Sequence, residues 1–355
     1  MGTSILSFII VLGVLIFFHE FGHFLVARFF GVGVEKFSLG FGPRLLGKKI
    51  GLTDYRISAI PLGGYVKMVG EEPDAEISPE EIPFSFTHKH VAKRMLIVAA
   101  GPFFNILLAV IIFFGIFFFS GTFVLKPSVG SVKPGSPAFT AGLEKGDLIT
   151  AINAIEINDW DEMAEIINTS KGQNLKLTVR RGDSSRNFSL APEKVTTKNI
   201  FGEDIQRYII GITASGETYS KEMSLLQAFS ESMVQTYRVS ELMVVIIAKL
   251  ITGDISTDTL GGPIMIAQMA GDSAKAGVGS LISFIALISI NLAIINLLPI
   301  PILDGGHLLF FSIEAIKGRP VSIKIREIAQ QVGMFILILL MILVFYNDIT
   351  RIFFS

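Results

Sequence analysis

The sequence predicts an α-helical membrane protein with about four transmembrane helices, a membrane-associated β-hairpin and one small β-rich domain outside the bilayer. Half of the 355 residues are apolar, only 17% are charged, and the mean hydropathy is +0.59. This composition is typical of integral membrane proteins rather than soluble ones. The formal net charge of −1 gives no indication of binding to nucleic acid. The apolar composition makes the lipid bilayer the expected partner.

The absence of cysteine limits the chemistry available to this chain. With no cysteine in the sequence, disulfide bonds, a thiol nucleophile and a thiolate metal site are all excluded. A metal bound by this protein must therefore be held by histidine and carboxylate side chains.

The first transmembrane helix is predicted over residues 5–30. Residues 5–18 form an almost unbroken apolar run, and apolar residues resume after a short polar group. At about 1.5 Å per residue, such a helix crosses a hydrocarbon core of about 30 Å. No basic residue precedes the run, so we expect a permanent anchor rather than a cleaved signal peptide.

The polar group inside that helix reads His19-Glu20-Phe21-Gly22-His23, an HExxH motif. Residues four apart lie on one face of a helix, so His19 and His23 can offer two imidazoles to one Zn²⁺ while Glu20 stands beside them as general base. Polar side chains inside a membrane are costly unless they are used. The motif therefore predicts a zinc hydrolase within the bilayer, for which a third protein ligand is still required.

Three further spans are predicted at residues 95–119, 281–298 and 332–346. The loops after the first and third spans are rich in Lys and Arg, whereas the extreme N-terminus has neither. Because basic loops stay in the cytoplasm, the first helix should run inward and residues 120–280 should lie outside. An apolar stretch at 243–251 is too short to cross and is expected to form an amphipathic helix near the outer surface.

Helix direction points to the third ligand. The first and third spans both run inward, so the C-terminal end of the third span should arrive at the depth of His19 and His23. Asp304 is the acidic residue at that end, where Pro299 and Pro301 should break the helix and leave backbone groups facing a polar cavity. We therefore predict Asp304 as the third zinc ligand.

Several polar side chains near the predicted site have two interpretations. Asp304 could instead cap the helix end or pair with Arg326, and His307 is a rival ligand. Asn296, in the same span, either orients the substrate or makes an interhelical hydrogen bond. Asn105, in the second span, is expected to serve packing.

The region outside the membrane begins with a predicted small β-barrel with helices at residues 121–195. Short β-like runs alternate with Gly, Pro and Asp turns, and a helix is predicted between Trp160 and Asn168. The stretch GSPAFTAGLEKGDLITAIN resembles the PDZ signature found in bacterial proteases. PDZ domains bind extended peptides or a C-terminal carboxylate at a sheet edge, so a peptide or protein ligand is implied. Residues 196–280 are expected to form an extracytoplasmic connecting region that contains the amphipathic helix.

The motifs together resemble the site-2 protease family (peptidase family M50), in its bacterial RseP type. The resemblance rests on HExxH in the first span, the Asn-x-x-Pro and Leu-Asp-Gly run in a late span, and the PDZ-like region between them. Further matches lie at residues 61–68, 101–105 and 261–264. The resemblance implies an intramembrane zinc metalloendopeptidase in which His19, His23 and Asp304 bind Zn²⁺. Glu20 is then the catalytic base.

The resemblance also implies where a substrate binds. A cytoplasmic β region associated with the membrane is expected within residues 33–70, and its edge could hold an unwound substrate as an added strand. Substrate contacts are expected at Asn296, Pro299, Gly63, Gly64 and Tyr65. The implied substrates are transmembrane proteins, such as an anti-sigma factor already trimmed outside, or remnant signal peptides. The best-known members carry two PDZ domains in tandem, whereas this chain accounts for one.

The predicted organisation is a catalytic core in two parts, residues 1–120 and 281–355, in the bacterial cytoplasmic (inner) membrane. The rival functions are a polytopic membrane transporter and a PDZ scaffold with a non-catalytic metal site. A transporter predicts internal repeats, which the sequence does not have, and a scaffold leaves HExxH and Asp304 without a role. Hydrolysis of peptide bonds within transmembrane segments is therefore the predicted function.

Overall fold

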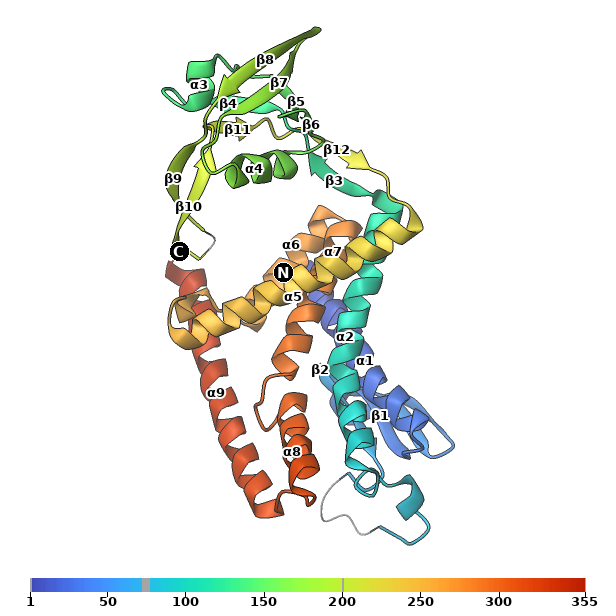
Figure 1. Ribbon diagram of the computed structural model, residues 1–355. Helices are drawn as coiled ribbons and strands as arrows, with labels where there is room; N and C mark the ends of the chain where they lie inside the picture. The colour runs from blue at the N-terminus through green and yellow to red at the C-terminus, as the bar shows by residue number, and fades with distance from the viewer. Residues whose placement is uncertain (1, 72–76, 200, 355) are drawn as a thin grey trace. The chain divides into compact units, whose positions relative to one another are not determined.

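The computed structural model describes residues 2–71, 77–199 and 201–354 and divides the chain into two compact units (Figure 1). The first, the helical unit, consists of Met1–Ile116 and Phe229–Ser355. The second, the β unit, is Phe117–Ala228. The buried apolar side chains form separate clusters in the two units, so each unit has a hydrophobic core of its own.

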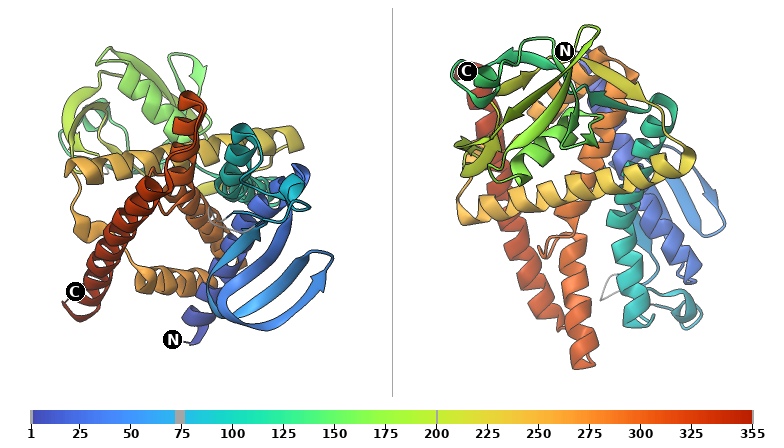
Figure 2. Two further views of the ribbon diagram at one scale, coloured as in Figure 1. Left: turned by 90° about the horizontal axis from the view of Figure 1, so that it is seen from below. Right: turned by 45° about the horizontal axis from the view of Figure 1, so that its top comes forward.

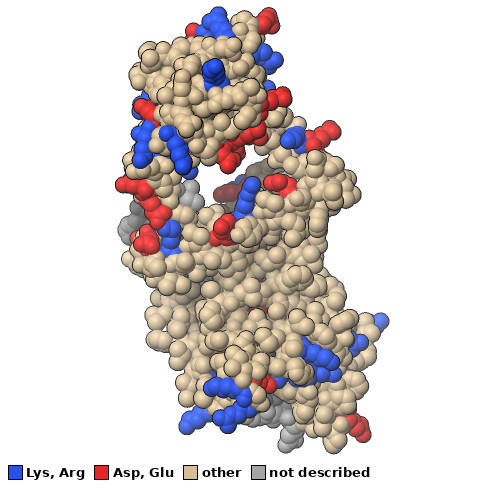
Figure 3. All heavy atoms as spheres, in the orientation of Figure 1, with Lys and Arg blue, Asp and Glu red and all other residues tan. Residues whose placement is uncertain are grey.

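Four helices of the described chain are long and apolar enough to cross a membrane. They are α1 (Gly2–Phe29), α2 (Val91–Ser120), α7 (Val278–Asn296) and α9 (Ile323–Phe354). The four predicted spans are therefore confirmed as helices, although α9 extends well beyond the expected residues 332–346. Figure 3 shows few charged side chains on the middle of the helical unit, where such helices would face lipid.

A further long helix, α5 (Leu225–Thr252), runs across these helices rather than along them (Figures 1 and 2). It begins much earlier than the amphipathic helix expected at 243–251, and it is not among the candidate spans. Its apolar side chains Phe229, Tyr237 and Ile251 are exposed. An exposed apolar face on a transverse helix is typical of a position in the membrane interface.

The third predicted span ends in a break. α7 stops, and α8 (Asp304–Lys317) begins after a turn that contains Pro299 and Pro301. Proline cannot continue a helix because it has no N–H to donate. Gly305 and Gly306 let the turn fold onto the start of α8, since a Cβ at either position would overlap with the backbone of the turn. The predicted third ligand therefore begins a new helix and does not end the third span, which corrects the expectation.

The predicted β region is formed by β1 (Val34–Ile50) and β2 (Thr53–Met68). Residues 34–39 pair on one side with residues 64–68 and on the other with residues 54–57. In the described register, the 64–68 segment has a strand partner on one side only. This segment is therefore an edge strand. A short 3₁₀ helix, Ile82–Phe84, follows in the loop to α2.

Two apolar clusters hold α1 on either side of its polar group. Val11 and Leu15 pack with α2, α7 and α6 (Pro263–Ala276). Further along α1, Ala27 packs with β1, β2, α2 and α8. Because protein interiors are close-packed, contacts at both ends fix how far α1 can slide or rotate. The polar residues between the clusters are therefore held at a defined place.

The start of α6 is held by the last helix. Asp348 of α9 is buried and accepts hydrogen bonds from the backbone N–H groups of Gly262, at 2.9 Å, and Ile264, at 3.0 Å. A carboxylate there satisfies N–H groups that have no partner within their helix, and it matches the helix dipole. A side chain at position 262 would overlap with this carboxylate. The contact explains the glycine before Pro263.

The β unit is built from short strands and two short helices. Its largest sheet has the strand order β6-β5-β7-β8, and its core side chains come mainly from this sheet and from α4. The elements are β3 (Thr122–Leu125), β4 (Val129–Val132), α3 (Pro137–Ala141), β5 (Leu148–Ile152), β6 (Ile155–Glu156), α4 (Trp160–Thr169), β7 (Leu175–Arg181), β8 (Ser184–Leu190), β9 (Glu193–Lys198), β10 (Asp204–Ile209), β11 (Ile212–Ala214) and β12 (Thr218–Lys221).

The β unit continues past the boundary expected at residue 195. β9 and β10 form a hairpin, β11 pairs with β4, and β12 pairs with β3. Ile210, just before β11, is only 2% exposed and belongs to the core. The last strands therefore close on the first ones, so the connecting segment after this unit is shorter than the predicted 196–280.

A buried ion pair joins the residue before β5 to the end of β7. The Asp147 side chain is 0% exposed, and it accepts hydrogen bonds from Arg181 at 2.7 and 2.8 Å and from the backbone N–H of Glu144 at 2.9 Å. Burial raises the pKa of this carboxyl, but the hydrogen bonds from Arg181 and Glu144 outweigh it. They hold the pKa of Asp147 below its ordinary value.

Acid should therefore weaken the β unit. A carboxyl with a lower pKa in the folded than in the unfolded chain contributes stability that is complete above its unfolded value, about 4, and is lost as the pH falls through the folded value. We expect the unfolding temperature to drop as the pH falls below about 4. Asp147→Asn should lower stability at neutral pH and flatten this dependence. Trp160, the single tryptophan, reports the unfolding of this unit by fluorescence in the full-length protein.

The matched control is Asp183→Asn, which changes an exposed carboxylate at the β7–β8 turn. It should leave both the stability and its pH dependence unchanged. Identical pH profiles for the wild type and Asp147→Asn would show that the ion pair does not set the acid sensitivity.

Candidate active site

The buried middle of α1 brings two imidazoles together. His19 and His23 lie one turn apart, and their Nε2 atoms are 3.3 Å apart. Their rings meet edge to face, with centroids 4.9 Å apart, and the two residues are only 9% and 8% exposed. Two converging imidazole nitrogens are part of the usual ligand set of zinc.

The first residue of α8 completes the group. Asp304 Oδ2 lies 3.1 Å from His19 Nε2 and 3.6 Å from His23 Nε2, and the ligand atoms of all three residues lie within 4.8 Å of one another. Among the described residues, Oδ2 is buried and makes no well-aligned hydrogen bond, although two imidazoles approach it. One carboxylate and two imidazoles, with no described proton donor aligned on this oxygen, fit a divalent cation such as Zn²⁺.

α8, the helix that carries Asp304, contacts α2 through a buried ion pair. Arg94 of α2 donates a hydrogen bond of 2.5 Å to Glu314 of α8, and its guanidinium lies 4.9 Å from the centre of the Phe311 ring. Arg94 is only 8% exposed. A desolvated charged hydrogen bond with a stacked guanidinium is specific in geometry. It therefore fixes α8 against the helix that also supports the imidazoles.

α2 supports both histidines from behind. His23 Nδ1 donates a hydrogen bond to the backbone oxygen of Ile97 at 2.9 Å, and Asn105 Nδ2 lies 3.3 Å from His19 Nδ1. Gly101, between these two positions, faces both rings, and a Cβ there would overlap with the imidazole of His23. The glycine is therefore what lets α2 approach the two rings.

A cavity of about 220 Å³ opens beside this group. Its wall includes the edge strand 64–68, and Gly64 comes so close to α1 that a Cβ there would lie 3.1 Å from Cγ of Glu20. Charged and polar groups share the lining with apolar ones. The lining residues are His19, Glu20, His23, Gly64, Tyr65, Val66, Met68, Glu71, Phe86, Val98, Asp304, His307, Phe311 and Arg326.

The predicted substrate residues are divided by the structure. Gly64 and Tyr65 line the cavity, whereas Gly63, Asn296 and Pro299 are not among its lining residues. Asn296 ends α7, and Pro299 lies in the turn that follows.

The alternatives to Asp304 as ligand are also separated by the geometry. His307 lines the cavity but does not belong to the close group of ligand atoms found among the described residues. Arg326 lines the cavity as well. The ion pairs that the described structure gives for Asp304 are with the two imidazoles.

Gly101 and Asn105 are the contacts that sequence reasoning missed. Asn105 was expected to serve packing, yet it is fully buried against the ring of His19. The sequence did contain a signal for this contact in the spacing of the residues. Gly101 and Asn105 are four residues apart, as His19 and His23 are, so each pair lies on one face of its helix. Two such pairs on two neighbouring apolar helices indicate faces that meet.

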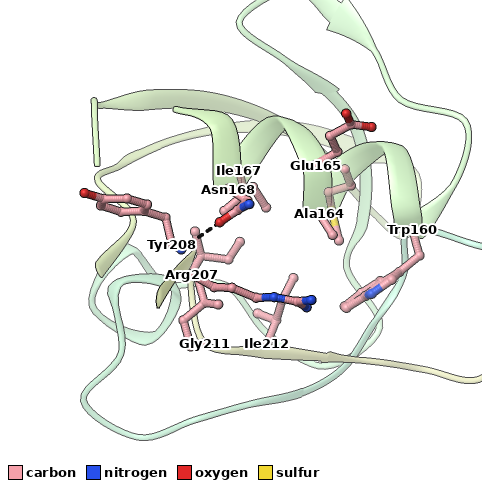
Figure 4. A pocket seen from close by; sticks show the side chains of 12 residues that line it. Trp160, Ala164, Glu165, Ile167, Asn168, Arg207, Tyr208, Gly211 and Ile212 are labelled. Carbon is pink, nitrogen blue, oxygen red and sulfur yellow. Dashed lines mark hydrogen bonds between the residues drawn. The ribbon is translucent and has the colours of Figure 1, made fainter. Parts of the chain in front are cut away.

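A second cavity, of about 330 Å³, lies in the β unit between α4 and the segment from β10 to β11 (Figure 4). Trp160, Ala164 and Ile167 of α4 line one side, and Ile212 lies on the other. The backbone N–H of Tyr208 donates to Asn168 Oδ1 at 3.0 Å, which ties the two sides together at one end.

Comparison with known proteins identifies the family. Residues 7–340 match the sequence profile of peptidase family M50. Proteins of Agrobacterium fabrum and Rickettsia conorii are 37% and 38% identical over 98% and 99% of this chain, and over 95% and 99% of their own lengths. A protein of Campylobacter jejuni is 38% identical over 99% of this chain and 94% of its own length. The names of all three assign them, by inference, to the zinc metalloproteases.

Among solved structures, the PDZ domain of an SdrC-like protein from Listeria monocytogenes aligns with 24% of this chain and 84% of its own length, at 27% identity and a TM-score of 0.20. The family assignment rests instead on the profile match and on relatives aligned over almost the whole chain. The chain belongs to peptidase family M50, and it is a zinc metalloprotease of the site-2, intramembrane type.

Proposed function

We propose that His19, His23 and Asp304 hold the zinc ion of this intramembrane protease and that Glu20 is its general base. The observation that carries the proposal is the convergence of three ligand atoms within 4.8 Å of one another, beside a cavity that Glu20 also lines. A catalytic zinc needs about three protein ligands and one open position, which this arrangement provides.

The bound zinc supplies Lewis acidity, which polarises the scissile carbonyl and makes a water molecule easier to deprotonate. Glu20 takes the proton from the attacking water and returns it to the leaving nitrogen. Its position next to His19 in the sequence, on the same turn of α1, keeps the carboxylate beside the ligands. The hydrogen bond from His23 Nδ1 to Ile97 leaves Nε2 of that ring free to bind the metal.

We propose that the substrate enters this cavity as an extended strand. A transmembrane helix keeps its carbonyl groups in hydrogen bonds with N–H groups four residues on, so it must unwind locally before attack. The 64–68 edge lines the cavity through Gly64 and Tyr65, and in the described register its strand partner lies on one side only, which suits strand addition on the other. Gly63, Asn296 and Pro299 would contact the substrate where it leaves this edge.

The proposed setting is the bacterial inner membrane, with the loops rich in Lys and Arg on the cytoplasmic side. Lys and Arg side chains between α1 and α2, and those from the end of α8 to the start of α9, support this orientation. The zinc site then lies toward the cytoplasm and the β unit outside. The proposed substrates are transmembrane segments, for example of a trimmed anti-sigma factor or a remnant signal peptide.

The test of this function distinguishes the general base from the zinc ligands by measuring both activity and bound zinc. Purified full-length protein is assayed for cleavage of a reporter that carries a single transmembrane segment, with zinc content measured on the same samples. Glu20→Gln should bind one zinc per chain and lose activity by about 10³-fold or more, the order of magnitude expected for loss of acid–base catalysis. Asp304→Ala should lose both zinc and activity, and a chelator should inactivate the wild type.

The control for Asp304 is His307→Ala, which changes a cavity residue outside the proposed ligand group and should keep zinc. If Asp304→Ala retained the metal while His307→Ala lost it, the ligand assignment would be wrong. Equal cleavage by wild type, Glu20→Gln and chelated protein would overturn the proposed chemistry.

Gly101 gives a second prediction about the same site. The added Cβ of Gly101→Ala would overlap with the imidazole of His23, so the rings must shift or α2 must move away. Overpacking of this kind costs about 1–3 kcal/mol, and we expect zinc affinity to fall by about tenfold or more as the ligands lose their geometry. Competition with a chelator of known zinc affinity measures the change.

Gly115→Ala is the matched control, because Gly115 lies in the same helix and an added Cβ there meets nothing within 4 Å. It should bind zinc as the wild type does. The interpretation fails if the two alanine variants bind zinc equally well.

We also propose that the β unit binds the end of a peptide chain, as its PDZ-like sequence implies. The specific observation is the second cavity, which places an apolar helix face opposite β11. In the described sheets β11 pairs with β4 alone, so its other edge is available for an added strand.

This proposal predicts peptide binding that Trp160 reports, since the single tryptophan lines the cavity. A pentapeptide that ends in valine with a free carboxylate should shift Trp160 emission saturably, and its C-terminal amide should bind more weakly. Ala164→Leu should fill the cavity and weaken binding by about tenfold, which corresponds to about 1.4 kcal/mol. Ala191→Leu changes an exposed alanine of the same unit and should have no effect. An unchanged titration with Ala164→Leu would rule out this cavity as the site.

A further inference from the structure

Asn105 is the polar side chain of α2 that lies nearest to a proposed zinc ligand. It is 0% exposed, and its Nδ2 is 3.3 Å from Nδ1 of His19. Its Oδ1 is buried and has no hydrogen-bond partner among the described residues. A buried amide oxygen without a partner is costly, so an arrangement that satisfies it should be favoured.

The chemistry of a zinc-bound imidazole fixes which end of this amide must face the ring. A neutral imidazole carries one N–H, so a ring that binds metal through Nε2 carries its hydrogen on Nδ1. Nε2 of His19 is the nitrogen that faces Asp304 and His23. Nδ1 must therefore donate, and an amide NH₂ group cannot accept that hydrogen. The amide oxygen can.

The two ends of a carboxamide have nearly the same shape, and a half-turn about the terminal torsion exchanges them. After that turn Oδ1 would occupy the place beside Nδ1 of His19, and the unsatisfied oxygen would gain a partner. We propose that Asn105 is a positioning residue of the zinc site, which accepts the Nδ1 hydrogen of His19 through Oδ1 and so directs Nε2 to the metal. This inference rests on the proposed role of His19 as a ligand.

A contact behind the second ring supports the inference. The other histidine already has this arrangement, since His23 Nδ1 donates to the Ile97 oxygen, a group that can only accept. Ser289 of α7 contacts Asn105 at its backbone and not at its amide, since it donates a hydrogen bond to the Asn105 carbonyl oxygen at 2.7 Å. α2 thus holds one acceptor behind each ring, a backbone oxygen for His23 and an amide oxygen for His19.

The test compares two variants of similar shape in the full-length protein. Asn105→Leu keeps the volume but removes the acceptor, and it should lower zinc affinity by about 10–100-fold, the usual effect of losing such a partner. Asn105→Asp keeps an acceptor and should retain zinc affinity within about threefold, as carboxylate–histidine–zinc arrangements do. Affinity is measured with Zn²⁺ alone against a competing chelator. The visible absorption of the Co²⁺-loaded protein, which reports ligand geometry, should change in Asn105→Leu and not in Asn105→Asp.

Ser289→Ala is the matched control, because it removes a buried hydrogen bond to Asn105 without touching an imidazole. It should leave zinc affinity and the Co²⁺ spectrum unchanged. Wild-type affinity and spectrum in Asn105→Leu would overturn the inference, as would equal losses in Asn105→Leu and Ser289→Ala. His19→Ala separates this failure from failure of the proposed function. If His19→Ala still binds zinc with wild-type affinity, then the proposed ligand set is wrong.

A measurement on the wild type covers the case in which Asn105→Leu does not fold. In zinc-loaded protein with ¹⁵N-labelled histidine, the His19 signals are those that disappear in His19→Gln. We expect Nδ1 of His19 to carry the hydrogen and Nε2 to be the metal-bound nitrogen. A hydrogen on Nε2 with an unprotonated Nδ1 would overturn the proposed role of Asn105.

Discussion

The structure depends on one constraint, which is that ionisable side chains from opposite ends of the sequence must meet among apolar helices. Asp304 lies at the start of α8, far along the chain from the histidines of α1, yet its Oδ2 is 3.1 Å from His19 Nε2. A carboxylate in such surroundings is costly unless it is paired or binds a metal. The apolar clusters on both sides of the site, together with the Arg94–Glu314 contact, hold α1, α2 and α8 in place. In this arrangement the carboxylate meets the imidazoles, which offsets the cost of burying it.

Close approach of backbones makes that meeting possible, and it explains where glycine is required. A Cβ at Gly22 of α1 would overlap with the backbone oxygen of Ala100 on α2, and one at Gly101 would overlap with the His23 ring. On the other side of α1, Gly64 brings the edge strand to Glu20. Helices in a membrane associate largely through such small residues, because lipid provides no hydrophobic drive between them. The glycines therefore set the size of the site.

Much of this arrangement was predictable from the sequence, because its signals are short sequence patterns or follow from the number of membrane spans. Runs of apolar residues gave the four spans, and HExxH gave two imidazoles on one helix face. Helix direction brought Asp304 to their depth, although the structure places it at the start of α8 instead of the end of the third span. That error has a physical cause. Pro299 and Pro301 predict a break, but not the direction in which the chain leaves it.

The parts that could not be predicted are those that depend on tertiary contacts. β11 and β12 are short, and they belong to the β unit because they pair with β4 and β3, which are distant in sequence. Asn105 is similar, since an asparagine in an apolar helix has the same local pattern whether it packs or supports a ligand. Only its distance to His19 Nδ1 separates the two roles.

The edge strand beside the site, like the ligand cluster, can be explained by the cost of polar groups that lack a partner in apolar surroundings. On the proposed function, a substrate helix must unwind next to Glu20, and each residue that unwinds releases one N–H and one C=O group. In surroundings without water, each unpaired group costs about 1–3 kcal/mol. Unwinding several residues would therefore cost as much as the stability of many whole domains, about 5–15 kcal/mol. In the described register, strand 64–68 has a strand partner on one side only and lines the cavity, so on the proposed function it can pair with these groups as they are released. On the proposed function, a backbone edge beside the catalytic site therefore lowers the cost of unwinding the substrate, as the metal lowers the cost of the attack.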